Sequence, residues 1–511
     1  MRSGGNRCRP LTAGVALVAM ATASGAGAET LREALARAYE SNPTITGARA
    51  QLRATDENVP IARAAGLPNL SANGSATDNV LQANNNFLNP ERLGNGQLQL
   101  TVPIYQGGAV RNGILAAETR VEAGRAGLRN TEAVTFTNVV AAYMNVIRDE
   151  AIVGLNTQNV RVLQTNLDAS RDRFQVGDLT RTDVAQSEAR LALARAQLQS
   201  AEATLISSRE NYVAVVGAAP TALDQPPALP SLPGSADLAV REALASNPQL
   251  QSSRRTADAA RYDIGVARAN RLPRVSAVTA GTYFNYLGSL PSVANGQRIP
   301  NSGTAATIGL QLSLPLFQGG RPAAQVRQAE ALRGQALEQQ TATERAVIAQ
   351  TRSAFAVNRS AQQVIASAEA AVNANKLSLE GVRAENSVGT RTILDILNAE
   401  QELLNSQVTL VTARRDAYVA GFALLAAMGR AEARDLGLDG GTLYDPTVNY
   451  RRVSDRIFDF DDDGMPDAVS PTTSSVPAQD ASVTRPLDPA LDSNVDRNPA
   501  LTTGASSPNR R

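Results

Sequence analysis

The sequence contains no histidine and no tryptophan, and its one cysteine is Cys8. Serine-histidine-aspartate triads, cysteine nucleophiles beyond the first residues, and histidine-ligated or zinc sites all need those side chains, so the sequence excludes them. Aromatic residues make up 4% of the chain, which is low for a compact globular core of 511 residues. Only carboxylate, lysine, tyrosine or serine and threonine chemistry would remain to an enzyme, and no pocket motif supports paired carboxylates. We therefore expect a protein that is not an enzyme and that holds no cofactor.

The sequence also lacks an excess of positive or negative charge. Lys and Arg number 49 and Asp and Glu 48, so no field would attract nucleic acid. No stretch of about 18 uncharged apolar residues follows the first 28, and no membrane-spanning helix is expected there. If this chain meets a membrane, it must do so with the strands of a β-barrel.

Residues 1–28 have the features of a cleaved export signal. Three arginines flank the start of an apolar run over 11–23, and Ala26 and Ala28 are small residues before the expected cleavage point. Cys8 precedes the apolar run, so it cannot become a lipidated first residue of the mature chain. We expect an exported protein without a lipid anchor.

The rest of the chain is a duplicated unit. Ser41-Asn42-Pro43 returns at 246–248 with an offset of 205, and Gln106-Gly107-Gly108 returns at 318–320 with an offset of 212. The predicted segments are a first repeat (29–224), a Pro-rich linker (225–236), a second repeat (237–430) and a C-terminal periplasmic extension (431–511) that is largely disordered.

Each repeat contains a strand in which apolar and polar residues alternate strictly, at 97–104 and at 307–316. This period indicates one apolar and one polar face, as a membrane barrel needs, although a half-buried strand of a soluble sheet would alternate in the same way. Partner strands are expected near 67–81 and 272–287. Four strands are too few for a membrane barrel, whose smallest members have about eight, so several chains must share one barrel.

The helical pattern predicts long hairpins. Proline is absent from 107–173, and apolar residues recur every seven from Val139 to Phe174, which indicates a helix about 100 Å long. A return helix at 183–217 alternates large and small residues along its seam, as antiparallel coiled coils do. The short helix at 43–66, stacked end to end on the return helix, would nearly match the long one.

Two motifs resemble those of TolC-type outer-membrane channels. One is P-[IL]-[YF]-Q-G-G at the end of each alternating strand, and the other is V-G-T-R-T-I-L-D-I-L-N-A-E at 388–400. The resemblance covers about 31–430. It implies a homotrimer in the outer membrane lipid, with a twelve-stranded barrel and an α-helical periplasmic tunnel, docked by a periplasmic adaptor and an inner-membrane ABC or proton-driven pump.

The resemblance also implies a periplasmic gate at the hairpin tips. Asp395 matches the first acidic position of the family motif, Asp183 is its counterpart in the first repeat, and Arg391 matches the basic residue of the closing network. Asn398 stands where a second aspartate is usual, and Asn386 where a gating tyrosine is usual. We therefore expect a weaker ring of negative charge than the family pattern implies.

Local structural roles compete with the gate. Thr180 with Asp183, and Thr392 with Asp395, fit the T-x-x-D pattern of a capped helix start. Left-handed turns between helices account for Gly177 and Gly389. Six residues are expected where strand becomes helix, and they are Pro103, Gly107, Gly108, Pro315, Gly319 and Gly320.

A possible calcium loop occurs in the C-terminal extension. Its candidate ligands are Asp459, Asp461, Asp463 and Asp467. The twelfth position is Ser470 rather than glutamate, and we therefore prefer a solvated acidic run.

The function expected from the sequence is a passive exit duct of a tripartite export system. The absent lipid anchor and the 388–400 motif favour type I protein secretion, with small-molecule efflux as the alternative. A periplasmic coiled-coil adaptor without membrane strands is a more remote alternative.

Overall fold

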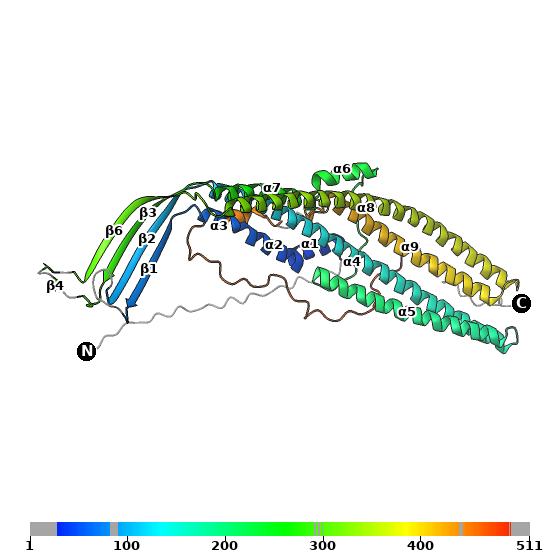
Figure 1. Ribbon diagram of the computed structural model, residues 1–511. Coiled ribbons are helices and arrows are strands. Elements are labelled where there is room, and N and C mark those ends of the chain that lie inside the picture. The colour runs from blue at the N-terminus through cyan, green and yellow to red at the C-terminus, as the bar shows by residue number, and fades with distance from the viewer. Residues whose placement is uncertain are drawn as a thin grey trace, which may run out of the picture.

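The computed structural model describes residues 28–81, 90–290, 293–294, 297–298, 300–438, 443–489 and 491. The expected export signal lies outside these residues except for Ala28. The molecule is elongated, with a sheet at one end and the tips of two helical hairpins at the other (Figure 1). No helix of the described residues is long and apolar enough to cross a membrane.

Four strands form one antiparallel sheet in the order β1-β2-β3-β6, so each repeat supplies two adjacent strands. They are β1 (Asn69–Asp78), β2 (Arg92–Gln106), β3 (Arg274–Asn285) and β6 (Ser302–Ser313). The four predicted strands are thereby confirmed. β2 begins five residues before the alternating segment that predicted it, because Arg92 to Gly96 still pair with β1. A short ribbon of β4 (Val293–Ala294) and β5 (Gln297–Arg298) was not predicted.

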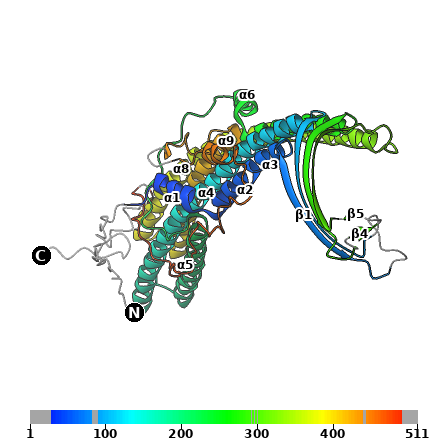
Figure 2. The ribbon, with the colours of Figure 1, turned by 90° about the vertical axis from the view of Figure 1, so that its left-hand side faces the viewer.

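The sheet is a curved single layer that extends away from the helices (Figure 2). Ile308, Leu310 and Leu312, which alternate along β6, are 89%, 75% and 68% exposed in the single chain. Large apolar side chains in water are unfavourable, so this face needs a covering that one chain does not provide.

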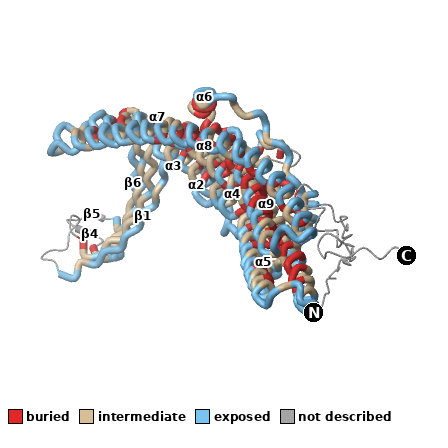
Figure 3. Tube along the Cα trace, turned by 90° about the vertical axis from the view of Figure 1, so that its right-hand side faces the viewer, coloured by how far each residue is buried: buried red, intermediate tan, exposed pale blue. Residues whose placement is uncertain are grey.

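Two helical hairpins form the other end of the molecule. Their helices are α4 (Ala109–Gln175), α5 (Arg181–Val216), α8 (Arg321–Ser387) and α9 (Ile393–Met428). Both long helices have 67 residues and both return helices 36, which confirms the predicted hairpins. Buried residues gather along α4 and α9, where the two hairpins pack together, whereas much of α8 is exposed (Figure 3).

Short helices complete each repeat. Those that continue the return helices toward the sheet are α2 (Pro43–Asp56), α3 (Asn58–Ala64) and α7 (Pro248–Ala269), whereas α1 (Leu31–Ser41) packs against α4 and α5, and α6 (Ala236–Ser246) packs against α8 and α9. The single helix predicted at 43–66 is wrong, because the chain breaks it at Glu57 into α2 and α3. Pro60 cannot donate an amide proton and its ring crowds the carbonyl four residues earlier. Gly265 stands at the corresponding place in the second repeat, and α7 is continuous there.

An asparagine joins the short and return helices in each repeat. The Asn42 side chain accepts a hydrogen bond from the Thr44 amide at 2.8 Å, which caps α2, and its Nδ2 donates to the Val215 carbonyl of α5 at 2.8 Å. In the second repeat, Asn247 caps α7 and its Nδ2 donates to the Ala427 carbonyl of α9 at 2.9 Å. The predicted end-to-end stacking is therefore confirmed.

The C-terminal extension follows a defined course where the structure describes it. After α10 (Thr447–Val453) the chain runs without strands along the helices. Asn449 donates to the buried Asp56 carboxylate of α2 at 2.8 Å. The hydroxyl oxygens of Ser470 and Thr46 lie 2.8 Å apart and share a hydrogen bond. We expected a largely disordered extension because it is rich in Pro, Ser and Asp. That composition disfavours regular secondary structure, but it leaves the side chains able to bind the helices.

We predict that Gly429→Ala destabilises the junction in the second repeat. Gly429 has φ +79°, and a Cβ there would lie 2.6 Å from the Ser246 carbonyl oxygen. The left-handed backbone alone should cost about 1–2 kcal/mol, and the contact with a backbone atom adds to it. Thermal loss of the helical circular dichroism signal should therefore occur at a lower temperature.

Gly334→Ala in α8 is the matched control. Nothing lies within 4 Å of a Cβ at Gly334, and replacing a mid-helix glycine should stabilise the chain by about 0.5–1 kcal/mol. Equal melting temperatures for Gly429→Ala and the unsubstituted chain would contradict the role of the junction.

Candidate gate at the hairpin tips

The two hairpins turn in the same way at their tips. In the first, Gly177 has φ +84° and the Asp178 amide donates to the Arg173 carbonyl at 2.9 Å. In the second, Gly389 has φ +85° and the Thr390 amide donates to the Glu385 carbonyl at 3.1 Å. The predicted left-handed glycine turns are confirmed, and each returns the chain antiparallel to the long helix it leaves.

Each return helix begins with a reciprocal cap. The Asp183 amide donates to the Thr180 hydroxyl oxygen at 3.3 Å, and the Thr180 amide donates to the Asp183 carboxylate at 3.0 Å. Thr392 and Asp395 repeat both bonds at 3.3 and 3.0 Å. The capping role predicted for both aspartates is confirmed. It fixes both carboxylates at the first turn of a helix, where the positive end of the helix favours them.

The caps also shift the ionisation of these carboxyl groups. Hydrogen bonds from the Thr180 hydroxyl and amide lower the pKa of Asp183 below its usual 3.8. The Thr392 hydroxyl and amide lower the pKa of Asp395 in the same way, and the charge of Arg391 adds to the effect. Both groups are therefore negatively charged at neutral pH.

Arg391 and Asn386 act within the second tip. Arg391 Nε donates to Glu385 Oε2 at 2.7 Å, and Asn386 Nδ2 donates to the Arg391 carbonyl at 2.7 Å. The Asn386 side chain thus stabilises the turn at Gly389 by bonding across it to Arg391. In the single chain, the guanidinium of Arg391 is bonded to its own hairpin through Glu385.

Asn398 connects the two hairpins. Its Oδ1 accepts a hydrogen bond from Arg190 Nη2 of α5 at 2.7 Å. The sequence pointed to Asn398 but not to Arg190, because a lone arginine on a helix face carries no distinctive pattern. The missing second acid is therefore replaced by a neutral acceptor that is already bonded to a cation.

A buried polar cluster behind the tips was also missed. Arg383 of α8 and Glu400 of α9 form an ion pair at 2.8 Å, with side chains 3% and 5% exposed. Asn166 of α4 donates to the same Glu400 oxygen at 3.1 Å. The available signal was one charged residue on each helix of the second hairpin. The packing of α4 against α9 then adds Asn166 to the pair.

The remaining candidates lie apart from the tips. Pro103 does not lie where strand becomes helix, because β2 continues past it to Gln106; it lies at a register shift, where a residue without an amide proton is tolerated. Pro315 follows the end of β6, as expected. Four glycines at the start of the long helices have positive φ, and they are Gly107, Gly108, Gly319 and Gly320.

The acidic residues of the candidate calcium loop, for which we preferred a solvated acidic run, lie in the C-terminal extension. Asp463 accepts from Arg452 at 2.7 Å and from Arg456 at 3.0 Å, and Arg456 also lies 3.4 Å from Asp461. Within the described part of the chain, no group of three or more acidic, cysteine or histidine side chains could hold a metal ion. Asp461 and Asp463 therefore form ion pairs with arginines of the same extension.

The elongated fold, with its single-layer sheet and paired hairpins, is that of an outer-membrane channel. The family model described as "Outer membrane efflux protein" matches residues 34–218 and 239–430. The chain therefore belongs to the outer membrane efflux protein family. Its members are passive channels rather than enzymes, and they lie in the outer membrane with a periplasmic helical domain.

Individual relatives agree with this family. Outer membrane efflux protein BepC of Brucella suis is 34% identical over 88% of this chain and 96% of BepC. Outer membrane protein TolC of Escherichia coli is 28% identical over 84% of this chain and 87% of TolC. The alkaline protease secretion protein AprF of Pseudomonas aeruginosa is 29% identical over 59% of this chain and 62% of AprF.

The solved structure of the outer membrane protein VceC of Vibrio cholerae has the same fold. Its TM-score is 0.66 at 24% identity, over 78% of this chain and 96% of VceC. The predicted fold class, a membrane β-barrel closed by three chains and continued by long coiled-coil hairpins, is confirmed. TolC-family channels are trimers that work with periplasmic adaptors and inner-membrane pumps.

We predict that Thr392→Ala loosens the second tip. The substitution removes the hydroxyl from the cap and should cost about 1 kcal/mol. Hydrogen exchange of the amides at the start of α9 should become several-fold faster at neutral pH. Thr409→Ala is the control, because Thr409 is exposed in the same helix and donates only to the Asn405 carbonyl at 2.8 Å.

The effect should depend on pH. The pKa of Asp395 in the folded chain lies below its usual 3.8. The charged cap therefore stabilises the tip above about pH 4 and is lost as the pH falls through the lower folded value. An exchange difference between Thr392→Ala and the unsubstituted chain that stays constant to the lowest pH would contradict the charged cap.

Proposed function

We propose that this protein is the passive exit duct of a tripartite export system, docked to a periplasmic adaptor and an inner-membrane pump. The single-layer sheet carries this proposal. β1 and β6 are its edge strands, and the apolar residues of β6 are exposed in the single chain. Pairing β6 of one chain with β1 of the next would satisfy the edges and place those residues against lipid.

The hairpin tips are proposed as the periplasmic gate of this duct. Both repeats place a glycine turn and a capped aspartate at the end farthest from the sheet (Figure 1). Three copies of Asp183 and Asp395 would surround the axis with negative charge. Low-dielectric walls around a narrow opening concentrate such a field, so the closed mouth should favour cations.

The cargo proposed first is an unfolded protein passed on by a type I secretion pump, as the 388–400 motif favours. The name of AprF, a protease secretion protein, supports this use. Small-molecule efflux is the second candidate, and the name of BepC, an efflux protein, supports it. A passive duct accepts both uses because the pump selects the cargo.

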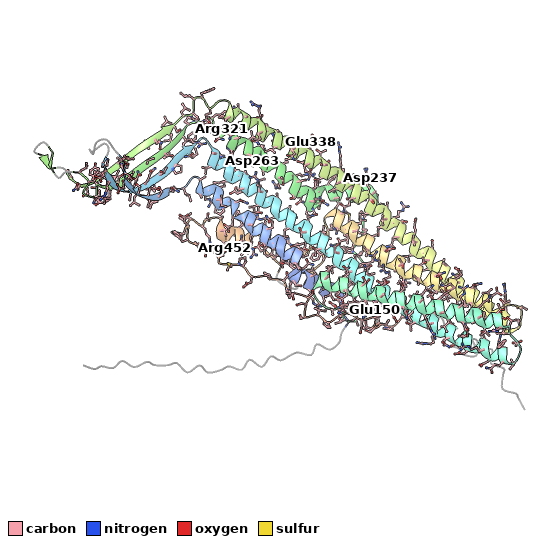
Figure 4. All side chains as sticks on the ribbon, turned by 60° about the horizontal axis from the view of Figure 1, so that its bottom comes forward. Glu150, Asp237, Asp263, Arg321, Glu338 and Arg452 are labelled. Atoms are coloured by element: carbon pink, nitrogen blue, oxygen red, sulfur yellow. The ribbon has the colours of Figure 1, made fainter. Side chains whose placement is uncertain are left out.

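We predict that Asp395→Asn nearly abolishes cation selectivity and divalent-cation block of the purified trimer in planar bilayers, because the substitution removes three charges from the mouth. Asn398→Asp should strengthen both, because it adds three. Asp237→Asn is the control, since Asp237 lies on α6, far from the tips (Figure 4).

Stability must be measured on the same samples, because Asp395 also caps α9. Unchanged selectivity in Asp395→Asn, with a lower melting temperature, would leave Asp395 as a cap alone and refute its part in the gate.

The cargo is tested by deleting the gene in its own organism. If the duct serves protein secretion, one or a few proteins should disappear from the culture medium while drug susceptibility stays within about twofold. Restoring the gene should return them. A secreted protein set that does not change, with susceptibility raised many-fold to several toxic compounds, would replace secretion with efflux.

A further inference from the structure

The last described part of the C-terminal extension crosses both hairpins. We name residues 479–489 and 491 the strap. The strap has no helix or strand of its own, and it contacts α5 and α4 of the first hairpin and then α9 of the second. Glu150 of α4, which Figure 4 labels, accepts a hydrogen bond from Thr484 of the strap.

The strap covers a buried ion pair. Arg209 of α5 and Glu150 of α4 are bonded to each other, and their side chains are 6% and 2% exposed. Arg209 Nη1 donates to the carbonyl and the carboxylate of Asp480 at 2.8 and 3.0 Å. The carbonyl of Ser482 accepts from Arg209 Nη2 at 2.6 Å, and the Thr484 hydroxyl donates to Glu150 at 3.0 Å.

These bonds supply most of the pair's hydrogen-bonding partners, and Arg209 Nε and Glu150 Oε2 are buried without one. Charged groups taken out of water need hydrogen-bonding partners, and the strap supplies two carbonyls, a carboxylate and a hydroxyl. Two of the acceptors are backbone carbonyls, so the site binds the extended backbone of the strap as well as its side chains.

A second anchor lies between α4 and α9. Leu491 is 2% exposed and packs in the apolar cluster that contains Leu155 of α4 and Leu403 of α9, and Leu487 lies against the same cluster. Gln407 Nε2 donates to the Leu491 carbonyl at 2.6 Å.

A charged contact accompanies this apolar anchor. Arg414 of α9 donates to the Asp488 carboxylate at 2.7 Å. The surface that the strap covers therefore offers Arg209 and Arg414, an apolar cluster, and side chains that donate to backbone carbonyls.

We propose that the surface where α4, α5 and α9 meet is a binding site for an extended peptide, and that the strap is its occupant in this protein. At Arg209 the site selects an acidic residue and two backbone carbonyls. Farther along the peptide it selects two leucines with an acidic residue between them, and this acidic residue binds Arg414. Because the strap touches both hairpins, its occupancy holds them together. This site lies apart from the tips and does not rest on the proposed cargo.

The experiment cleaves the chain between α10 and the strap and asks whether the strap stays bound. A recognition sequence for a site-specific protease is inserted between Pro466 and Asp467, which are both exposed. The full-length protein is purified in detergent, cut, and passed over a size-exclusion column. The C-terminal fragment should elute with the channel, and an excess of a synthetic peptide of residues 479–491 should displace it.

Variants on both sides of the site measure its contribution. Arg209→Ala should release the fragment at least about tenfold faster, since hydrogen bonds to charged groups contribute that much. Arg195→Ala is the matched control on α5, because Arg195 is exposed and donates to Gln164 at 2.8 Å. Leu487→Asp changes only the strap, so it tests the site without disturbing the buried pair.

Retention in the unsubstituted chain and in Arg195→Ala, with faster release from Arg209→Ala and Leu487→Asp, supports the peptide site. Loss of the fragment from the unsubstituted chain as soon as it is cut would overturn the proposal. So would release from Leu487→Asp at the unsubstituted rate.

Discussion

Asn42 and Asn247 each hold together two helices that are far apart in the chain. One side chain caps the short helix with its oxygen and holds the end of the return helix with its amide group. The return helices have 36 residues against 67 in the long helices, so a return helix alone would cover about half of its partner. The coaxial junction extends the helical wall toward the sheet, and the hairpins and the sheet depend on that continuity.

The sequence predicted most of this architecture because duplication and periodicity are local signals. The four strands, both hairpins and the end-to-end stacking followed from repeats, alternation and heptads. The break at Glu57 was missed although Pro60, three residues later, is the local signal for it. The second repeat has Gly265 at that place, and α7 is continuous there. The early start of β2 was missed because pairing of backbone groups does not require alternating side chains.

The candidate gate was predicted in its residues but not in their contacts. Turn glycines and T-x-x-D caps are bonded within a few residues, and the structure places them as expected. Arg190 with Asn398, and Arg383 with Glu400 and Asn166, join helices separated by up to 234 residues. The pairing of α8 with α9 brings Arg383 to Glu400, and the packing of one hairpin on the other brings Asn166 to Glu400 and Arg190 to Asn398. The strap was missed for the same reason, because composition describes a segment and not the surface that receives it.

The matching of helix lengths between the repeats limits how such a protein can change in size. The two long helices have the same number of residues, and so do the two return helices, while the strand-loop-strand span from Pro68 to Leu98 is seven residues shorter than its counterpart from Pro273 to Leu310. One added heptad in a single long helix would displace its tip by about 10 Å relative to the other. Growth of the tunnel in evolution therefore requires paired insertions in both arms of a hairpin and in both repeats, whereas the loops can change length independently.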